Sequence, residues 1–506
     1  MSNRSSHHKR GTARTAKRAA RTEIKSHVRP PLLRRRADYN AYPDHVVQET
    51  HARVLSITES VGIEFRDERA LSLWRKVGAN VDGALVKIPG ELLMTLIDQT
   101  PPEFTLHGRN TERNVIIGGR HTVFGPGYGA PNVIDLDWQR RPSTLEDLEN
   151  FYRLTHMTPA VQVNGGVIVE PMDLPIPVRH LQMVFQGFRL TDKPVLGPVL
   201  SKEQVDDAIA MAGVLFGTEY VDEHPVYLAL INSNSPRVWD STMLIALMTY
   251  AQHGQAVLCQ PFTMQGTSAP ANSMAAVALC YAEALAAVAL MQIIRPGTPA
   301  IVGVGGGVAS MKTGGPMSGT PEGFWSTFLG AQMARYYRLP SRSIGCPSAS
   351  KHPDLFAGYE AGVRALSTTL AGVNFINHAS GMLDGLLTMS YAKCVADHEL
   401  IDILYFTIAG DDREDADEAL ATIAEVAPGG HFLDSPHTRS HFPYQPQLQD
   451  YNTYEQWDEE GRLNADERGR QRAREVLNAY EEPDLDPGIS KALGQFVNRR
   501  TTELGA

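Results

Sequence analysis

The sequence contains few cysteines and no grouping of them that would build a site. Its 506 residues include only four, Cys259, Cys280, Cys346 and Cys394, which stand far apart in apolar surroundings. No pair has the spacing of zinc ligands, and nothing suggests a disulfide framework. We therefore expect a reducing, cytoplasmic setting and no tightly bound metal.

A secretory signal and a clear membrane span are also lacking. No hydrophobic core follows the arginines at 34–36, so the basic N-terminus is not a signal peptide. The apolar stretch Met274 to Ile294 has membrane-spanning length, but it is rich in alanine and contains Glu283 and Gln292. We expect a buried helix there, and no membrane partner.

Acidic residues outnumber basic ones outside the N-terminus. Residues 1–36 carry a charge of about +11, which leaves about −21 for the rest of a chain whose total is −10. This basic segment has no apolar periodicity, so residues 1–37 are predicted to be a disordered arm that the fold does not need. A solvated tail is the simpler interpretation, and docking onto an acidic partner or nucleic acid is the alternative. For the protein as a whole we expect no nucleic-acid partner.

The rest of the chain has the composition of a globular protein, with 42% apolar and 21% charged residues. Residues 38–140 mix helical and strand-like patterns and are predicted to form an N-terminal α+β section. Residues 141–440 are predicted to form a β/α barrel. Residues 441–506 are predicted to be a helical C-terminal extension with a charged helix at 464–481.

The barrel is predicted from short apolar segments that alternate with helical ones. The predicted strands are 161–163, 194–198, 226–231, 256–259, 300–304, 342–346 and 373–377, and the helices between them are 178–190, 202–216, 240–253, 274–294, 321–337 and 355–371. Seven or eight such units in series favour a closed TIM-type (β/α)8 barrel over an open sheet. The eighth strand has no clear place in the sequence.

A glycine-rich loop follows the strand that starts at Ala300. Six glycines lie between Gly303 and Gly315, and Thr320-Pro321-Glu322 then has the pattern of a helix start. A dinucleotide fingerprint fails because residue 308 is valine, and a phosphate loop fails because residue 311 is methionine. A loop that approaches a large flat ligand and a merely structural loop both remain open.

The order of motifs resembles the trimethylamine/glycine betaine:corrinoid methyltransferase superfamily, and in particular its members without pyrrolysine. The matching segments are FGPGYGAPNVID (124–135), MKTGGPMSGTPE (311–322), LPSR (339–342), PDLFAGYE (353–360), VNFINHASG (373–381), DGLLTMSYAKCVAD (384–397) and PGGHFLDSPHT (428–438). The resemblance implies a barrel that moves a methyl group from an amine to cobalt(I) of a corrinoid (cobalamin) carried by a partner protein. Ser310, Lys312 and Phe356 depart from the family pattern, which leaves the substrate open.

The resemblance also implies site residues. Tyr128 matches a tyrosine that is expected to contact the substrate ammonium. Arg342 matches an arginine that is expected to bind the substrate carboxylate, and His378 matches a histidine that follows a strand. Lys312 is a further candidate for the carboxylate. In the glycine loop, Gly305, Gly306, Gly307 and Gly314 are expected to leave room for the corrin ring. Since Arg342 begins its predicted strand, a core ion-pair role is the alternative for that residue.

The resulting hypothesis is an amine methyltransferase with glycine betaine or a related betaine as the methyl donor. Methyl transfer from a quaternary ammonium releases a neutral amine, so the site has to position and desolvate the substrate more than to move protons. Aromatic rings hold such a cation, and Tyr128, Phe262, Trp325, Tyr359 and Tyr391 are candidates. The alternatives are a trimethylamine or other methylamine methyltransferase and a non-catalytic betaine-binding protein. We also expect a homo-oligomer.

Overall fold

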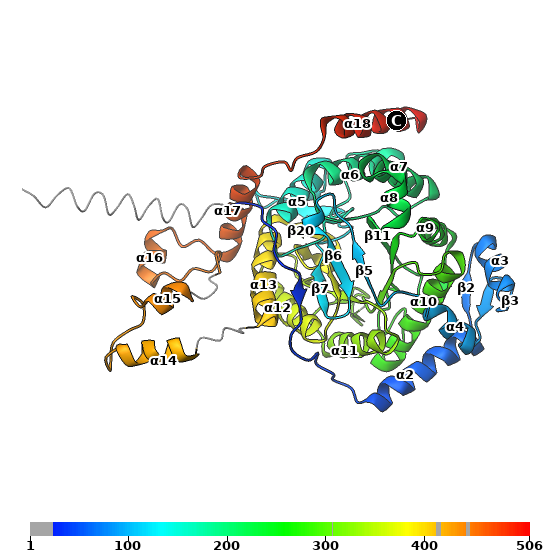
Figure 1. Ribbon diagram of the computed structural model, residues 1–506, viewed down its shortest axis with the longest axis horizontal. Coiled ribbons are helices and arrows are strands. Elements are labelled where there is room, and N and C mark those ends of the chain that lie inside the picture. Colours follow the sequence, from blue (N-terminus) through cyan, green and yellow to red (C-terminus); the bar gives the residue numbers. More distant parts are fainter. Residues whose placement is uncertain (1–23, 306, 411–415, 442–445, 506) are drawn as a thin grey trace, which may run out of the picture.

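The computed structural model describes residues 24–505 except 306, 411–415 and 442–445. A curled sheet surrounded by helices forms its centre (Figure 1). The sheet order is β1-β7-β18-β17-β14-β13-β11-β10, and all neighbours except β1 and β7 run parallel. The strands are β1 (Leu32–Leu33), β7 (His121–Phe124), β10 (Val195–Leu196), β11 (Tyr227–Ile231), β13 (Ala256–Cys259), β14 (Ala300–Gly303), β17 (Ser341–Ile344) and β18 (Phe375–Asn377).

The ring between β7 and β10 is completed by an irregular segment. The Gln162 N–H donates to the Phe124 carbonyl (3.0 Å), and the Asn164 N–H donates to the Pro194 carbonyl (2.8 Å). Only Asn164 forms a ladder bridge, with Val195. The predicted TIM-type architecture is thus confirmed, but regular strand pairing does not close the ring. The strand that the sequence left unplaced is β7.

The helices around the sheet start where the sequence supplies capping side chains. Thr144 and Asp147 form a capping box before α5, and Asp240, Asn272 and Asp354 cap α9, α10 and α12. The outer helices are α5 (Leu145–Met157), α6 (Ile176–Leu190), α7 (Lys202–Phe216), α8 (Thr218–Glu223), α9 (Ser241–Gln252), α10 (Ser273–Ile294), α11 (Pro321–Tyr336), α12 (Leu355–Leu370) and α13 (Tyr391–Ala409).

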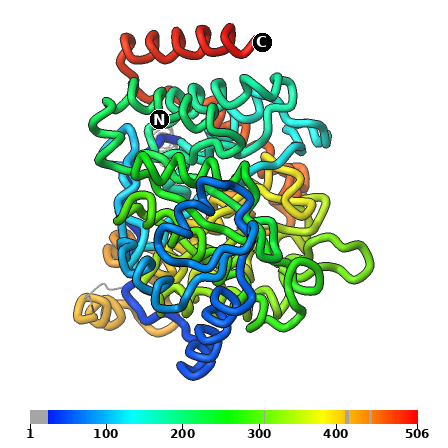
Figure 2. The backbone as a smooth tube through the Cα atoms, turned by 90° about the vertical axis from the view of Figure 1, so that its right-hand side faces the viewer, coloured from blue at the N-terminus to red at the C-terminus, as the bar shows by residue number. Residues whose placement is uncertain are grey.

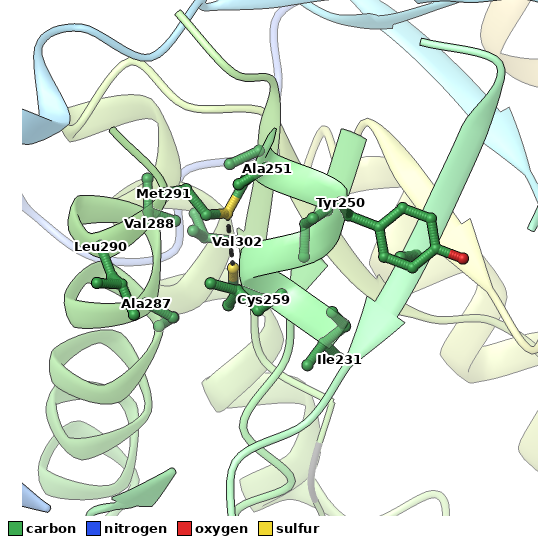
Figure 3. Close-up of a cluster of buried hydrophobic side chains, with 14 of the residues drawn as sticks. Ile231, Tyr250, Ala251, Cys259, Ala287, Val288, Leu290, Met291 and Val302 are labelled. Carbon is green, nitrogen blue, oxygen red and sulfur yellow. Dashed lines mark hydrogen bonds between the residues drawn. The ribbon is translucent and has the colours of Figure 1, made fainter. Parts of the chain in front are cut away.

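Helix α10 is the long apolar segment of the sequence, and it lies in the core. It is long and apolar enough to cross a membrane, yet most of its residues are buried inside the protein. Figure 3 shows Met291 of α10 against Cys259 of β13, with the two sulfur atoms 3.7 Å apart. Each large side chain buried in this way stabilises the folded state by about 1.5–3 kcal/mol. The prediction of a buried helix is confirmed.

Smaller elements precede the barrel and add to it. A four-stranded sheet has the order β12-β2-β4-β3, with β2 (Ile63–Phe65), β3 (Asn80–Asp82), β4 (Leu85–Lys87) and β12 (Val238–Trp239). Helices α2 (Asp44–Ser56), α3 (Glu68–Lys76) and α4 (Gly90–Ile97) accompany it, and β5 (Glu103–Leu106) pairs with β6 (Val115–Gly118). β7 precedes residue 140 but belongs to the barrel sheet, and β12 follows residue 140 but belongs to the four-stranded sheet. The predicted division at residue 140 therefore does not coincide with the start of the barrel.

The predicted disordered arm needs a correction. Residues 1–23 lie outside the described residues, but residues 24–37 pack on the barrel. Leu32 is buried in β1, next to β7. The buried Arg34 guanidinium donates to Thr122 Oγ1 (2.8 Å) and pairs with Asp38 (2.8 Å). Composition predicted a tail because a single apolar pair and one buried arginine do not produce a periodic pattern.

The C-terminal part is helical, as predicted, but it does not end at the charged helix. The remaining helices are α14 (Ala416–Glu425), α15 (Pro436–Ser440), α16 (Tyr454–Glu459), α17 (Ala465–Asn478) and α18 (Pro487–Glu503). α17 packs against α13, and α18 lies across α6 and α7 at the top of Figures 1 and 2. The division into four segments stays a prediction.

Candidate functional site

The barrel interior is apolar toward the N-terminal ends of its strands and polar toward their C-terminal ends. Val123, Leu258, Ile301 and Phe375 share one buried cluster with Phe104 and Ile117 of the β5–β6 hairpin. The hairpin therefore packs against the apolar end of the barrel. A ligand has to approach from the other end, where functional residues of such barrels gather.

Arg342 of β17 points into this interior. It pairs in register with Gly303 on one side and Phe375 on the other. A Cβ on Gly305 would lie only 2.0 Å from Arg342 Nη1, so a glycine is needed there for the guanidinium to fit. Burial lowers the pKa of Arg342 to about 9, which still leaves it charged at neutral pH.

Arg342 has no acidic partner within the described residues. Its Nη2 donates to His378 Nδ1 at 3.0 Å, whereas Nε and Nη1 are buried without a hydrogen bond. A buried cation without an anion is costly, so this guanidinium is prepared for a ligand that carries negative charge. The core ion-pair interpretation of Arg342 is therefore wrong.

His378 follows β18 and has an unusual backbone. Its φ is 52°, in the left-handed region, and its N–H donates to the Pro126 carbonyl (3.0 Å). Such strained residues cluster at functional sites. Because arginine can only donate, Nδ1 accepts and the ring proton lies on Nε2. Burial, reinforced by Arg342, holds the pKa of His378 well below its usual value, so the ring is neutral.

Tyr128 lies beside His378, in the turn that joins β7 to β8 (Asn132–Ile134). Their ring centroids are 6.4 Å apart at an interplanar angle of 73°. Burial raises the pKa of Tyr128, and its hydroxyl makes no hydrogen bond to any residue that the structure describes. The structure thus brings three of the predicted residues, Tyr128, Arg342 and His378, into one cluster.

Three buried amide side chains join this cluster by their position at strand ends. Gln260 Oε1 and both polar atoms of the side chains of Asn164 and Asn377 lack a hydrogen-bond partner. A Cβ on Gly305 would also approach Gln260 Nε2 at 2.5 Å, which places this amide beside Arg342. None of the three was predicted as a substrate-binding residue from the sequence, although each lies at or directly after a strand end. Unpartnered buried polar atoms are uncommon and require an explanation, such as a ligand.

The other predicted residues lie elsewhere. Lys312 is exposed in the turn between β15 (Val308–Ala309) and β16 (Pro316–Met317), and the structure does not bring it to the buried cluster. Gly306 lies outside the described residues. Gly305 packs over Arg342, whereas a Cβ on Gly314 would meet nothing within 4 Å. A Cβ on Gly307 would lie 3.1 Å from the Met317 carbonyl oxygen.

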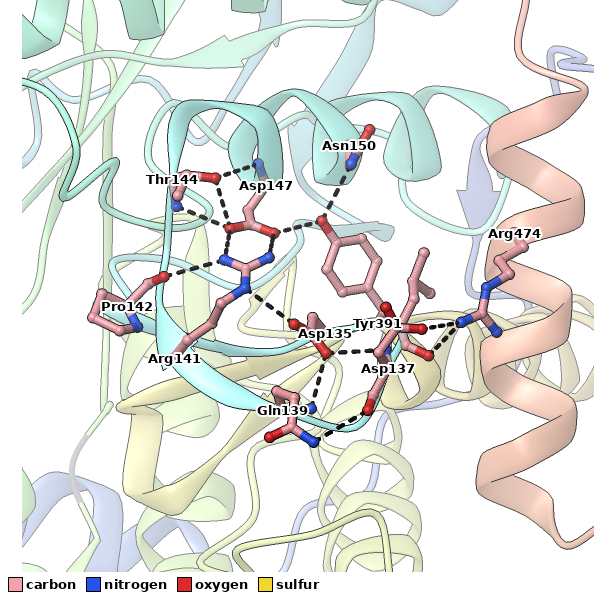
Figure 4. Close-up of polar contacts among 11 residues, drawn as sticks. Asp135, Asp137, Gln139, Arg141, Pro142, Thr144, Asp147, Asn150, Tyr391 and Arg474 are labelled. Atoms are coloured by element: carbon pink, nitrogen blue, oxygen red, sulfur yellow. Dashed lines mark hydrogen bonds and ion pairs between the residues drawn. The ribbon is translucent and has the colours of Figure 1, made fainter.

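Among the aromatic candidates, Tyr391 has a structural role that Figure 4 shows. Its hydroxyl donates to Asp147 Oδ1 (2.8 Å), and Arg141 binds both oxygens of the same carboxylate (2.6 and 3.0 Å). This network ties β9 (Arg140–Pro142) and its partner β8 to α5 and α13, and β8 follows the turn that carries Tyr128. Trp325 and Tyr359 are about half exposed on outer helices, whereas Phe262 is partly buried just after β13.

The described residues contain no group of three or more histidine, cysteine or acidic side chains that could hold a metal ion. The candidate site therefore consists of one cation, two rings and three amides. Its donors and rings suit a small organic ion better than a metal.

The chain is similar to known methyltransferases. The family model described as "Trimethylamine methyltransferase (MTTB)" matches residues 7–505. The chain is 39% identical over 471 residues to a glycine betaine methyltransferase of Desulfitobacterium hafniense, covering 92% of this chain and 98% of that protein. It is 26% identical to a trimethylamine methyltransferase of the same species, covering 92% and 94% of the two chains, and 28% identical to a proline betaine:corrinoid methyltransferase of Eubacterium limosum, covering 89% and 96%. The chain belongs to the trimethylamine methyltransferase (MTTB) family.

Proposed function

We propose that this enzyme transfers a methyl group from a carboxylated quaternary amine, with glycine betaine as the first choice, to cobalt(I) of a corrinoid on a partner protein. Relatives named for glycine betaine and proline betaine support this substrate class. The observation that carries the proposal is the Arg342 guanidinium, which is buried, charged and without an acidic partner among the described residues.

Arg342 would hold the substrate carboxylate through Nη1, which has no partner, together with the second N–H of Nη2. His378 accepts from the other N–H of Nη2 and thereby fixes the orientation of the guanidinium. The amides of Gln260 and Asn377 would complete the polar end of the site. Lys312 remains a proposed contributor only if the exposed turn moves toward the barrel.

The ammonium end would rest against aromatic faces. Tyr128 adjoins His378, and Phe262 follows the strand that carries Gln260. Each ring would contribute about 0.5–2 kcal/mol to binding a quaternary ammonium. His378 stays neutral, and the raised pKa of Tyr128 makes its hydroxyl a weaker acid. A site whose groups are weak acids suits a substrate that leaves as a neutral amine.

The corrinoid would supply a strong nucleophile, and it would have to reach the substrate from the C-terminal end of the barrel, because the β5–β6 hairpin packs at the other end. The glycine loop lies at this open end. Gly307 and Gly314 would leave room for the corrin ring, as predicted for the loop. Gly305 instead leaves room for the guanidinium of Arg342.

The test is methyl transfer to the reduced corrinoid partner with glycine betaine, proline betaine, carnitine, choline and trimethylamine. Choline is the decisive comparison because it has the same trimethylammonium group without the carboxylate. We expect glycine betaine to exceed choline by at least about 100-fold in kcat/KM, and Arg342→Gln to remove that preference. Equal use of choline, or use of trimethylamine alone, would refute the substrate assignment. Betaine binding without turnover would indicate a binding protein.

A homo-oligomer and a cytoplasmic location are part of the same proposal. Five exposed apolar residues follow a 3-4-3-4 spacing along α12: Phe356, Tyr359, Val363, Leu366 and Leu370. A stripe of this kind favours a helix of a second copy as its partner. Light scattering of the wild type and of Val363→Glu would test it, since the variant should have half the mass or less. The four buried cysteines are all free, which suits a reducing compartment.

A further inference from the structure

A second arginine lies buried near Arg342, in a place that the proposed substrate site does not use. Arg364 projects from α12 toward the start of α11 and is only 2% exposed. Its Nε has no partner, and no described residue forms a hydrogen bond or ion pair with its side chain. The ring of Phe324 lies 5.8 Å from its guanidinium carbon. Burial lowers the pKa of Arg364 to about 10, so it is charged at neutral pH.

The first turn of α11 faces this guanidinium and is itself uncapped. Thr320 is the N-cap residue, but its hydroxyl makes no capping hydrogen bond and is buried without a partner. The position that a Cβ of Gly323 would occupy lies 3.0 Å from Arg364 Nη2 and 3.6 Å from Thr320 Oγ1. Two unused donors thus converge on one side of a helix N-terminus, which favours negative charge.

The nearby acid does not complete the arrangement. Glu360 lies one turn before Arg364, but its Oε2 already accepts from Ser348 Oγ (2.5 Å) and from the Ala349 N–H (2.9 Å). Glu360 attracts Arg364 at longer range only, since no ion pair joins them. Arg364 also lowers the pKa of Arg342, so the two cations are near enough to repel each other. An anion between Arg364 and α11 would relieve this repulsion.

We propose that Arg364, Thr320 and the N-terminus of α11 form a second anion site, which takes a carboxylate or another small oxyanion. Its ligand has two possible sources with the same chemistry. One is a free anion from solution, which would neutralise the second guanidinium while a betaine binds at Arg342. The other is a second carboxylate on the methyl donor itself. The site rests on its own contacts and does not require the proposed function.

The test uses formate and inorganic phosphate as probes in chloride-free buffer, with binding measured by calorimetry and by the shift in Tm. Arg342→Gln removes the donor site, so saturable binding that remains in this variant reports the second site. Adding Gly323→Ala should weaken that binding at least tenfold, because a methyl group then lies where the two donors converge. Alanine also favours the helix more than glycine does, so the Tm without anion should not fall.

Gly358→Ala is the matched control, since a Cβ there meets nothing within 4 Å, and it should bind the probes like its parent. Arg364→Gln and Thr320→Val should weaken binding as well. Undiminished binding in Gly323→Ala and Arg364→Gln, or no binding in Arg342→Gln, would overturn the proposal.

Turnover separates the two sources without deciding whether the site exists. If the ligand is a free anion, formate should raise glycine betaine turnover in the wild type but not in Gly323→Ala. If it is part of the donor, a dicarboxylated betaine should lose at least tenfold in kcat/KM in Gly323→Ala, while glycine betaine loses little. Anion binding with no methyl transfer from any quaternary amine would refute the proposed function and leave the anion site standing.

Discussion

Gly305→Ala should inactivate the enzyme although it removes no side chain that binds substrate. The added Cβ would lie 2.0 Å from Arg342 Nη1 and 2.5 Å from Gln260 Nε2, both buried. Ordinary contact needs about 3.5 Å, so the guanidinium has to move by roughly 1–1.5 Å. The 3.0 Å hydrogen bond to His378 cannot survive a movement of that size. Misplacement by about 1 Å typically costs about 100-fold in rate, and overpacking costs about 1–3 kcal/mol of stability.

The assay is kcat/KM for glycine betaine in methyl transfer to the reduced corrinoid partner, together with Tm. We expect a loss of about 100-fold or more in kcat/KM and a Tm lower by a few degrees. Gly358→Ala serves as the control, because it adds the same methyl group on α12 where no atom lies within 4 Å. Wild-type activity and Tm in Gly305→Ala would show that the Arg342 guanidinium does not lie against this glycine.

Three further predictions concern the scaffold. Arg34→Ala should lower the free energy of unfolding by about 3 kcal/mol, because it removes the buried guanidinium that binds Asp38 and Thr122. An unchanged Tm would contradict the packing of residues 24–37 on the barrel. Burial raises the pKa of Asp147, but the hydrogen bonds from Arg141, Thr144 and Tyr391 together lower it more, so this carboxylate stabilises the fold above pH ~4 and less below it. Urea unfolding should therefore show Asp147→Asn less stable than wild type at pH 7, with the difference shrinking below pH 4. Burial lowers the pKa of His398 to about 3, whereas the value in the unfolded chain is ~6.5. The free energy of unfolding therefore falls as the pH drops below 6.5, by on the order of 2 kcal/mol at pH 5. His398→Gln should flatten that slope, and an unchanged slope would refute the assignment.

Segments with strong local signals were predictable. The strand at 256–259 and the helix at 202–216 are found where apolar runs and caps placed them. β7 was not assigned to the barrel because the next segment that hydrogen-bonds to it, 162–163, lies beyond the β8–β9 hairpin and α5, so no simple strand–helix repeat marks it. Its parallel neighbour, β18, lies about 250 residues away along the chain. Local patterns carry no information about pairings over such distances.

The site was only partly predictable for a similar reason. Tyr128, Arg342 and His378 came from resemblance, and the structure places them together. Gln260 directly follows a predicted strand, so the rule that site residues lie at the C-terminal ends of barrel strands (the strand-end rule) would have suggested it. Arg364 lies on a helix among apolar residues and resembles any surface arginine in the sequence. Only the absence of partners around its buried side chain distinguishes it, and such an absence is visible only in three dimensions.

Arg342 shows how the strand-end rule should be applied. It is the second residue of β17, two residues before the strand ends at Ile344. At about 3.3 Å per residue, this places its Cα roughly 6.6 Å below the strand end, a distance that an extended arginine side chain can span. The rule therefore concerns the reactive tip of a side chain and not its Cα. The interior has to be empty along that path, which Gly305 on the neighbouring segment ensures, whereas Gly303 allows the backbone of Arg342 to approach closely. An arginine near the start of a barrel strand, next to a strand that ends in glycines, is thus a candidate site residue, whereas a short side chain at the same position would belong to the core.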